Sequence, residues 1–274
     1  ALVLYASQIA QYILPLLTLP YLTRVLSRDK FGELAFAHSL LQYFVTLTEF
    51  GFGLSATRYI AIHRAGGTNL DRYCSAVIAA KVSLLTLSAA LVMVLVQTVP
   101  AIGRDPWVVY LTFLNVVGTA LFPSWLFQGL QRMEYILYRD IGTRILGVAG
   151  VFLFVRKAED YLLVPVVQFG VVATMGILSL LTVRSSCGIR LTRVSVGEVS
   201  AVMRESLPLF LSQAAILLYT TTNTFLLGLL APPFKVASFS VAQRVIAAVK
   251  SLIFPLMTAL YPHISLKGVH ARPE

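Results

Sequence analysis

The sequence predicts an all-α membrane protein, a polytopic bundle of about eight transmembrane helices, each needing about 20 apolar residues to span a bilayer. Only 12% of the 274 residues are charged, 57% are hydrophobic, and the mean hydropathy is +0.80. A soluble domain has about 25% charged residues, so these charges are too few to cover a surface exposed to water. The apolar residues also occur in runs of about 20 residues, which favours membrane-spanning helices over a large soluble core.

Eight apolar runs define the expected spans. If the N-terminus faces the cytoplasm, the loops on the cytoplasmic side carry more Lys and Arg than the loops on the other side. This is the distribution that the positive-inside rule describes, so the sequence predicts a cytoplasmic N-terminus. The spans cover about residues 2–23, 34–56, 74–98, 107–130, 138–155, 160–183, 207–230 and 234–262.

The longest polar connection divides the chain into two lobes. Residues 185–206 are rich in arginine, and Ser195 and Glu198 have the spacing of a capping box. Apolar residues then recur at helical intervals, so we interpret this segment as an amphipathic helix on the cytoplasmic membrane surface. It separates a six-helix N-terminal lobe, residues 1–184, from residues 207–274, the first two helices of an incomplete C-terminal lobe. We therefore expect the chain to be part of something longer.

A weak internal repeat supports the two-lobe division. Ser-Gln pairs at residues 7–8 and 212–213 begin similar hairpins, and residues 33–37 align with residues 236–240. Six spans separate the copies, so both copies cross the membrane in the same direction, as parallel repeats do. Transporters built in this way place their site between the lobes, so the second and eighth spans should face each other.

Several basic residues lie in or beside the apolar spans. Insertion scales assign a cost of about 2.5–3.5 kcal/mol to a central Arg or Lys, so such residues need a partner, a cavity or a function. Alternative interpretations are snorkelling to the interface for Lys81 and Arg144, and a cytoplasmic anchor for Arg58. The candidates for a cationic substrate-binding cavity are Arg24, Arg58, Lys81, Arg144, Arg244 and Lys250.

Polar residues within the spans provide the expected lining of the same cavity. His38, Gln42 and Glu49 lie on one stripe of the second span, and their alternative role is a hydrogen-bonded contact between helices. Glu49 and His38 could also titrate and couple transport to an ion. The complete set of polar candidates is His38, Gln42, Glu49, Gln128 and Asn223.

Other classes of function fit the sequence less well. The basic residues lie at helix ends and in loops, so membrane topology and contact with anionic lipid explain the basic excess. We therefore expect no nucleic acid as a partner. Cys74 and Cys187 stand alone, so we expect neither a disulfide framework nor a metal site, and no cofactor. An enzyme acting on lipid-linked sugars is not expected, because the acids of the candidate loops lack ligand spacing. These acids are Asp71, Glu134, Asp140, Glu159 and Asp160.

Three motifs in order carry a resemblance to a known family. They are residues 19–32, which begin LPYLTRVL and end FG, residues 50–58, FGFGLSATR, and residues 122–133, FPSWLFQGLQRM. The chain resembles Wzx-type polysaccharide transporters, or O-antigen flippases, of the MOP flippase superfamily, which also contains the MATE exporters. Members usually carry an acidic residue before the Gly-Phe step, and Glu49 fits. They normally have twelve or more spans in two six-helix lobes.

The resemblance implies a flippase in the bacterial inner membrane. It would move an undecaprenyl-pyrophosphate-linked oligosaccharide, an O-antigen or exopolysaccharide repeat unit, from the cytoplasmic to the periplasmic leaflet by alternating access. Its further partners would be membrane lipid, a polysaccharide polymerase and a chain-length regulator. Basic residues along the path agree with a pyrophosphate substrate. A MATE-like cation-coupled antiporter and an inactive truncated fragment are the alternatives.

Overall fold

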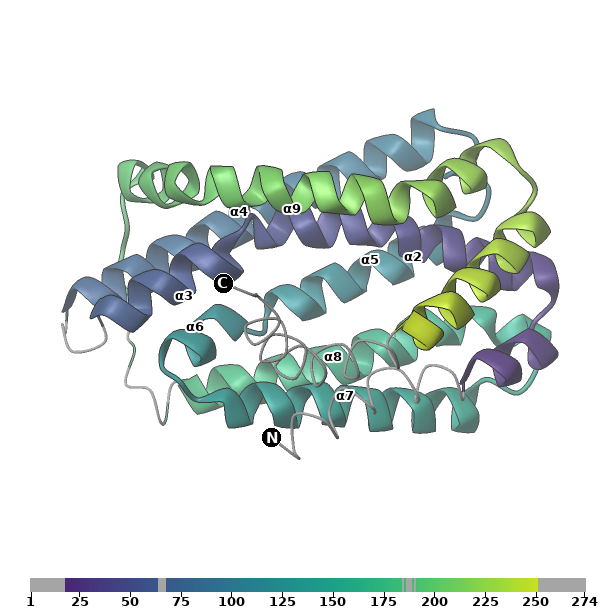
Figure 1. The fold of residues 1–274 in the computed structure, drawn as a ribbon, viewed down its shortest axis with the longest axis horizontal. Helices are drawn as coiled ribbons and strands as arrows, with labels where there is room; N and C mark the ends of the chain where they lie inside the picture. The colour runs from purple at the N-terminus through teal and green to yellow at the C-terminus, as the bar shows by residue number, and fades with distance from the viewer. Residues whose placement is uncertain (1–17, 64–67, 184, 186–188, 190, 251–274) are drawn as a thin grey trace, which may run out of the picture.

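The computed structural model describes residues 18–63, 68–183, 185, 189 and 191–250, and all regular structure within these ranges is helical. The all-α class is therefore confirmed for the described residues (Figure 1). Residues 18–25 and 233–250 are helical at the two ends of this part of the chain. Between them lie α2 (Arg28–Glu49), α3 (Phe52–His63), α4 (Thr68–Thr98), α5 (Pro106–Ala120), α6 (Ser124–Gly129), α7 (Met133–Phe154), the 3₁₀ helix η1 (Ala158–Leu162), α8 (Leu163–Thr182) and α9 (Val196–Leu230).

Four helical segments are long and apolar enough to cross a membrane. They correspond to the predicted spans 74–98, 107–130, 160–183 and 207–230, while the other predicted spans and the total of eight stay predictions. Most of span 2–23 and the last part of span 234–262 lie outside the described residues. The four observed segments are Leu70–Thr98, Pro106–Gly129, Ala158–Thr182 and Val196–Leu230.

Two of the predicted spans contain breaks that the hydropathy pattern did not locate. In span 34–56, α2 ends at Glu49; its C-terminal cap, Phe50, has φ 42°, and Gly51 follows with φ 77°. A Cβ on Gly51 would meet the backbone of α9 at 2.9 Å, so the glycine also permits close packing of the two helices. In span 107–130, α5 ends before Pro123, which forms the N-terminal cap of α6.

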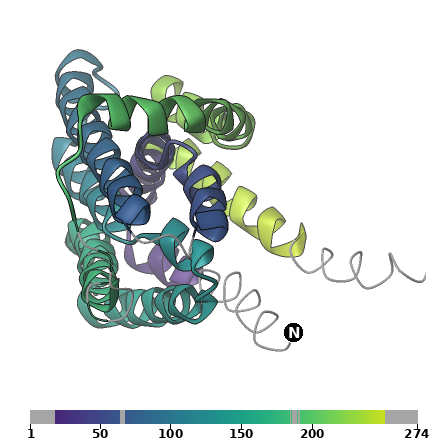
Figure 2. The same cartoon turned by 90° about the vertical axis from the view of Figure 1, so that its left-hand side faces the viewer.

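The boundary predicted at residue 206 falls inside one helix. α9 runs for 35 residues from Val196, or about 52 Å at 1.5 Å per residue, which exceeds a bilayer core of about 30 Å. Figure 2 shows the first part of α9 at a steep angle to the remainder, and Pro208 inside the helix explains such a bend. The predicted capping box is confirmed, because Ser195 Oγ accepts from the Glu198 amide and Glu198 accepts from the Ser195 amide. The separate helix predicted within 185–206 is thus the beginning of α9.

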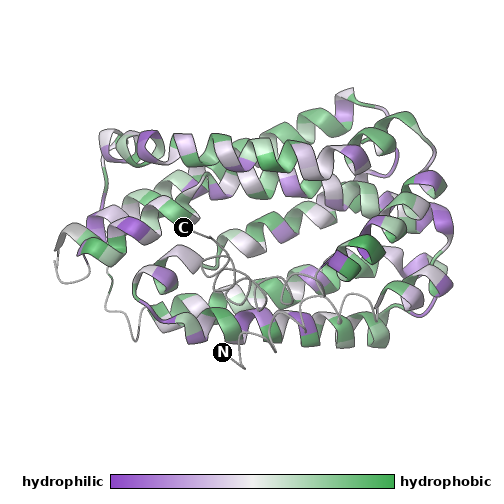
Figure 3. Cartoon of the chain, viewed as in Figure 1, coloured by the Kyte–Doolittle hydropathy of each residue, from purple (hydrophilic) through white to green (hydrophobic). Residues whose placement is uncertain are grey.

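Apolar packing around α2 organises the bundle. Phe36 and Phe44 of α2 are buried with Val92 of α4 and Val116 of α5, and α2 also contacts α9. Hydrophobic residues are spread along the whole length of the helices in Figure 3. Large apolar side chains such as Met93, 58% exposed, also point outward, as expected of a helix whose outer surface faces lipid.

Gly32 allows the last hairpin, formed by α9 and helix 233–250, to pack closely against α2. A Cβ at this position would overlap the carbonyl oxygen of Pro233, where helix 233–250 begins. We expect Gly32→Ala to destabilise the protein by about 1–3 kcal/mol, because the two backbones would have to separate. The measurement is the thermal unfolding of the purified protein in detergent.

Gly170→Ala is the matched control, because Gly170 lies in α8 with no atom within 4 Å of its added Cβ. Its replacement should leave stability unchanged or raise it by up to about 1 kcal/mol through helix propensity. Equal unfolding temperatures for the two variants would show that the close approach of α2 and helix 233–250 is not a tight constraint.

Candidate functional site

A cavity of about 450 Å³ lies between helices from both predicted lobes. Its walls come from residues 18–25, α2, α5, α7, α8 and helix 233–250. The volume falls within the range of about 300–1,000 Å³ that ligand cavities occupy. The structure therefore brings the eighth predicted span to the second one around a shared space.

Two arginines line this cavity from different helices. Arg144 belongs to α7 and Arg244 to helix 233–250, and both are half-buried. The Arg244 guanidinium carbon lies 5.8 Å from the centroid of the Phe31 ring, within cation–π range. None of the ion pairs among the described residues includes Arg244. The part of the cavity beside Arg244 can therefore attract an anion.

Other polar side chains complete the lining. His38 of α2 lines the cavity and is exposed, and its Nε2 lies 3.3 Å from the Nε2 of Gln42, which is not among the lining residues. Thr112, Thr143 and Gln168 also face the space. Sequence reasoning left these three out of the candidate set. Gln168 offered a signal, as a polar residue within an apolar span, but threonines in helices are too common to single out.

Glu49 and Lys81 form an ion pair away from this cavity. Lys81 Nζ lies 2.8 Å from Glu49 Oε1, and the two side chains are 5% and 27% exposed. The pair joins the end of α2 to α4, and neither residue lines the 450 Å³ cavity. The sequence predicts Glu49 and Lys81 in the lining of the cavity, but the structure places them together outside it, because α4 packs beside α2 and supplies the counter-charge of Glu49.

The remaining candidates lie elsewhere. Gln128 accepts a hydrogen bond from the Thr57 hydroxyl at 3.3 Å, so it joins α6 to α3, the alternative role weighed for such polar residues. Four further candidates do not line the cavity, and their side chains are exposed in the structure. These are Arg24, Arg58, Asn223 and Lys250.

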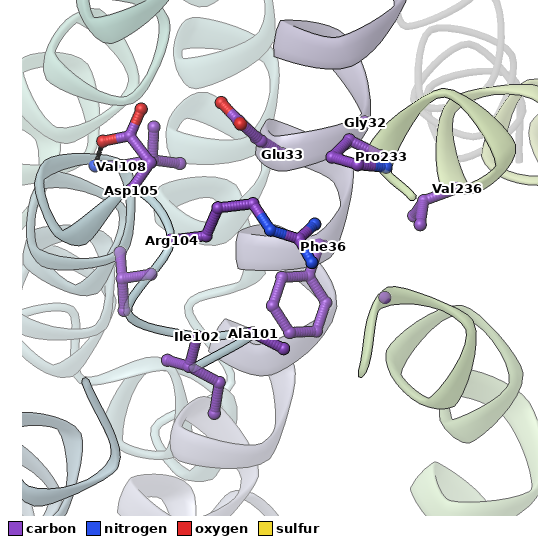
Figure 4. A pocket seen from close by; sticks show the side chains of 12 residues that line it. Gly32, Glu33, Phe36, Ala101, Ile102, Arg104, Asp105, Val108, Pro233 and Val236 are labelled. Atoms are coloured by element: carbon purple, nitrogen blue, oxygen red, sulfur yellow. Dashed lines mark hydrogen bonds between the residues drawn. The ribbon is translucent and has the colours of Figure 1, made fainter. Parts of the chain in front are cut away.

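A much smaller space of about 20 Å³ lies where α2 meets the last hairpin (Figure 4). It has room for about one water molecule, and Glu33, Arg104 and Asp105 contribute its charged groups. Beside it, Lys30 Nζ lies 3.0 Å from Glu33 and 3.3 Å from Asp105, and the Tyr161 hydroxyl donates to Asp105 at 2.7 Å. Burial acts to lower the pKa of Lys30, but hydrogen bonds to Glu33, Tyr161 and Asp105 outweigh it and raise the pKa. This cluster holds one end of the bundle together.

Comparison with known proteins now identifies the family. Residues 1–266 match the family described as "Polysaccharide biosynthesis protein". The chain belongs to this polysaccharide biosynthesis protein family. The match includes every helix that lines the 450 Å³ cavity, so both cavity arginines lie within the matched region of this family member.

Two curated relatives are described as transporters. This family member is 29% identical over 256 residues to the "Putative O-antigen transporter" of Escherichia coli (strain K12), covering 93% of the chain and 62% of the relative. It is also 29% identical over 265 residues to the "Putative O-antigen transporter" of Shigella dysenteriae, covering 96% and 66%. The chain thus spans just under two thirds of the length of these relatives. No solved structure matches. The predicted resemblance is confirmed at the level of the family.

The Glu49–Lys81 pair should contribute to stability. We expect Lys81→Met to destabilise the protein strongly, because Glu49 would keep a partly buried charge without its partner. The cost should be below the roughly 3–5 kcal/mol of a fully buried pair, because Glu49 is 27% exposed. Thermal unfolding in detergent measures the effect.

The double variant Glu49→Gln with Lys81→Met should recover part of the loss, because it removes both charges. Arg72→Ala serves as the control, since Arg72 pairs with Glu198 while 61% exposed, and such surface pairs contribute about 0–1 kcal/mol. A double variant as unstable as Lys81→Met alone would mean that packing around Lys81, and not charge, sets the loss.

Proposed function

We propose that this family member forms part of a transporter that flips an undecaprenyl-pyrophosphate-linked oligosaccharide across the bacterial inner membrane. Transport would run from the cytoplasmic to the periplasmic leaflet. The observation that carries the proposal is the pair of arginines, Arg144 and Arg244, that line one cavity within an apolar helical bundle. The descriptions of the two curated relatives as O-antigen transporters support the same substrate class.

The cavity offers the chemistry that such a substrate requires. A pyrophosphate carries its negative charge poorly through a medium of low dielectric constant, and a guanidinium compensates it with forked N–H donors. Thr112, Thr143 and Gln168 can exchange hydrogen bonds with sugar hydroxyls. The polyprenyl tail is as apolar as the surrounding lipid, so it can remain in the bilayer while the head group occupies the cavity.

Movement of the last hairpin against the remaining helices would open the cavity to either side. Arg244 stands on helix 233–250, whereas Arg144 and the other lining residues belong to the predicted N-terminal lobe. Rocking of two lobes around a central site is the usual mechanism of transporters with parallel repeats. The substrate would then move with the cavity and not through a fixed pore.

The lining favours this function over a MATE-like cation antiporter. Among the described residues that face the cavity there are two arginines and no carboxylate. A cation antiporter needs acidic groups in the membrane to bind its substrate and coupling ion. The best sequence candidate for that role, Glu49, is bound to Lys81.

Removal of either cavity arginine should impair export. In the full-length protein, we expect Arg144→Gln and Arg244→Gln each to lower surface polysaccharide by about tenfold or more. A hydrogen bond to a charged group contributes about 1.5–3 kcal/mol, and about 1.4 kcal/mol corresponds to a factor of ten. Surface polysaccharide is measured by immunoblotting, and protein abundance in the membrane is measured in parallel.

Lys235→Gln is the matched control. Lys235 is an exposed cation on the same helix as Arg244 and does not line the cavity, so its loss should leave export near the wild-type level. Normal polysaccharide in cells that carry both arginine substitutions would refute the proposed role of the cavity.

A further inference from the structure

The last hairpin meets α2 and α3 along one seam. In Figure 1 the connection between α9 and helix 233–250 lies at the same end of the bundle as the beginning of α2, and the beginning of α9 lies at the other end with α3. Helix 233–250 carries Arg244 into the lining of the 450 Å³ cavity. A tilt of the hairpin along this seam would therefore move one of the two cavity arginines.

The seam is closely packed at the end where α2 begins. A Cβ on Gly32 would overlap the carbonyl of Pro233, and a Cβ on Gly228 would overlap the ring of Phe36. Phe36 also stacks on Phe225, with the ring centroids 5.8 Å apart. Separation of the helices here would remove many van der Waals contacts at once. This end is therefore suited to act as a pivot.

Two buried hydroxyls meet at the other end of the seam. Ser55 Oγ of α3 lies 2.7 Å from Ser206 Oγ of α9, 151 positions along the chain, and the two residues are 3% and 0% exposed. Ser206 donates to the carbonyl of Val202 at 2.9 Å, so Ser55 supplies the hydrogen of the contact between the two serines. The Gly51 carbonyl lies 3.3 Å from Ser55 Oγ and can accept that hydrogen instead. Each hydroxyl thus has an acceptor on its own helix, and separation of the serines leaves neither donor unsatisfied.

Both helices are irregular beside this contact. Phe50 has φ 42°, a conformation that bulky residues rarely adopt, and Gly51 follows with φ 77°. In α9, Pro208 lacks the N–H that would donate to the carbonyl of Arg204. Backbone strain of the kind seen at Phe50 often occurs at switch regions. α3 and the beginning of α9 can therefore change their angle to the adjoining helices at these breaks.

The surroundings of the serine contact oppose its separation only weakly. Arg72 of α4 pairs with Glu198 of α9 at 2.9 Å, but Arg72 is 61% exposed, and such surface pairs contribute little to stability. A groove of about 370 Å³ begins one helical turn beyond the serines, and Tyr59 of α3 and Val202 of α9 contribute to its lining. α3 and α9 thus enclose open space on that side of the contact.

We propose that Ser55 and Ser206 form a latch that closes the cavity on the predicted cytoplasmic side. When the hairpin tilts about its packed end at Gly32, the two hydroxyls separate, and the helix that carries Arg244 moves away from α2. Neither serine lines the cavity, so both act by positioning helices and not by binding substrate. The inference rests on the proposed transport function and specifies which contact opens.

Thiol accessibility tests the latch without transport. In the full-length protein in proteoliposomes, Cys74→Ala and Cys187→Ala remove native thiols, and either Ser55→Cys or Ser179→Cys adds one. Ser179 is the matched control, because it is a buried serine of α8, 7% exposed, that donates to a carbonyl of its own helix. We expect a small water-soluble maleimide to label Ser55→Cys at least about tenfold faster than Ser179→Cys, because an opening that costs about 1.4 kcal/mol less is ten times more populated. Equal rates would overturn the proposal.

A disulfide tests whether the separation is needed for transport. In the same background, the double variant Ser55→Cys with Ser206→Cys is oxidised, and the loss of both free thiols verifies the bond. Translocation of a fluorescent undecaprenyl-pyrophosphate-linked oligosaccharide should fall about tenfold or more, because every turnover requires the latch to open. Reduction of the disulfide should restore translocation, and the oxidised single variants should retain it.

The outcomes separate the latch from the transport function. Full activity of the crosslinked protein would overturn the latch, as would failure of the two thiols to form a bond. An absence of translocation by the wild type would refute the proposed function, and the labelling rates would then decide the latch alone. Unfolding temperatures in detergent verify that all variants are folded.

Discussion

The cost of placing charge inside an apolar bundle governs this structure. Each ionisable side chain among the packed helices needs either a counter-charge or a polar space. Lys81 has the first solution, because Glu49 lies 2.8 Å away. Arg144 and Arg244 both border a polar space, the cavity of about 450 Å³. The two solutions separate residues that hold the bundle together from residues that can meet a ligand.

Close backbone packing determines where the cavity lies. Gly32 allows helix 233–250 to begin directly against α2, and Phe36 packs equally closely against Gly228 near the end of α9. The hairpin is thereby fixed at one end, and Arg244 lies further along its second helix, beside Phe31. A bulkier residue at Gly32 would displace the helix that carries this arginine, because it would meet the backbone of Pro233. Packing and charge placement are therefore coupled.

Membership of the polysaccharide biosynthesis protein family fits this arrangement. The chain spans 62% and 66% of two relatives described as O-antigen transporters, so the described helices correspond to part of those proteins. Most of the cavity lining comes from the predicted N-terminal lobe, and one arginine comes from the following hairpin. The proposed substrate-binding chemistry thus depends on contacts between the two parts of the chain.

The sequence by itself determined the helical class, the approximate positions of four apolar spans, the capping box at Ser195 and the family, because these depend on local composition, periodicity and motifs. Only the tertiary structure decided which charged residues meet. Glu49 and Lys81 are 32 positions apart, and Gln128 bonds to Thr57 across 71 positions. Helical spacing predicts the face of the helix on which a side chain lies. The residue that this side chain contacts depends on how the helices pack. For that reason the sequence patterns predicted one cavity for all of these charged residues. The structure pairs Glu49 with Lys81 outside the cavity and places Arg144 and Arg244 in its lining.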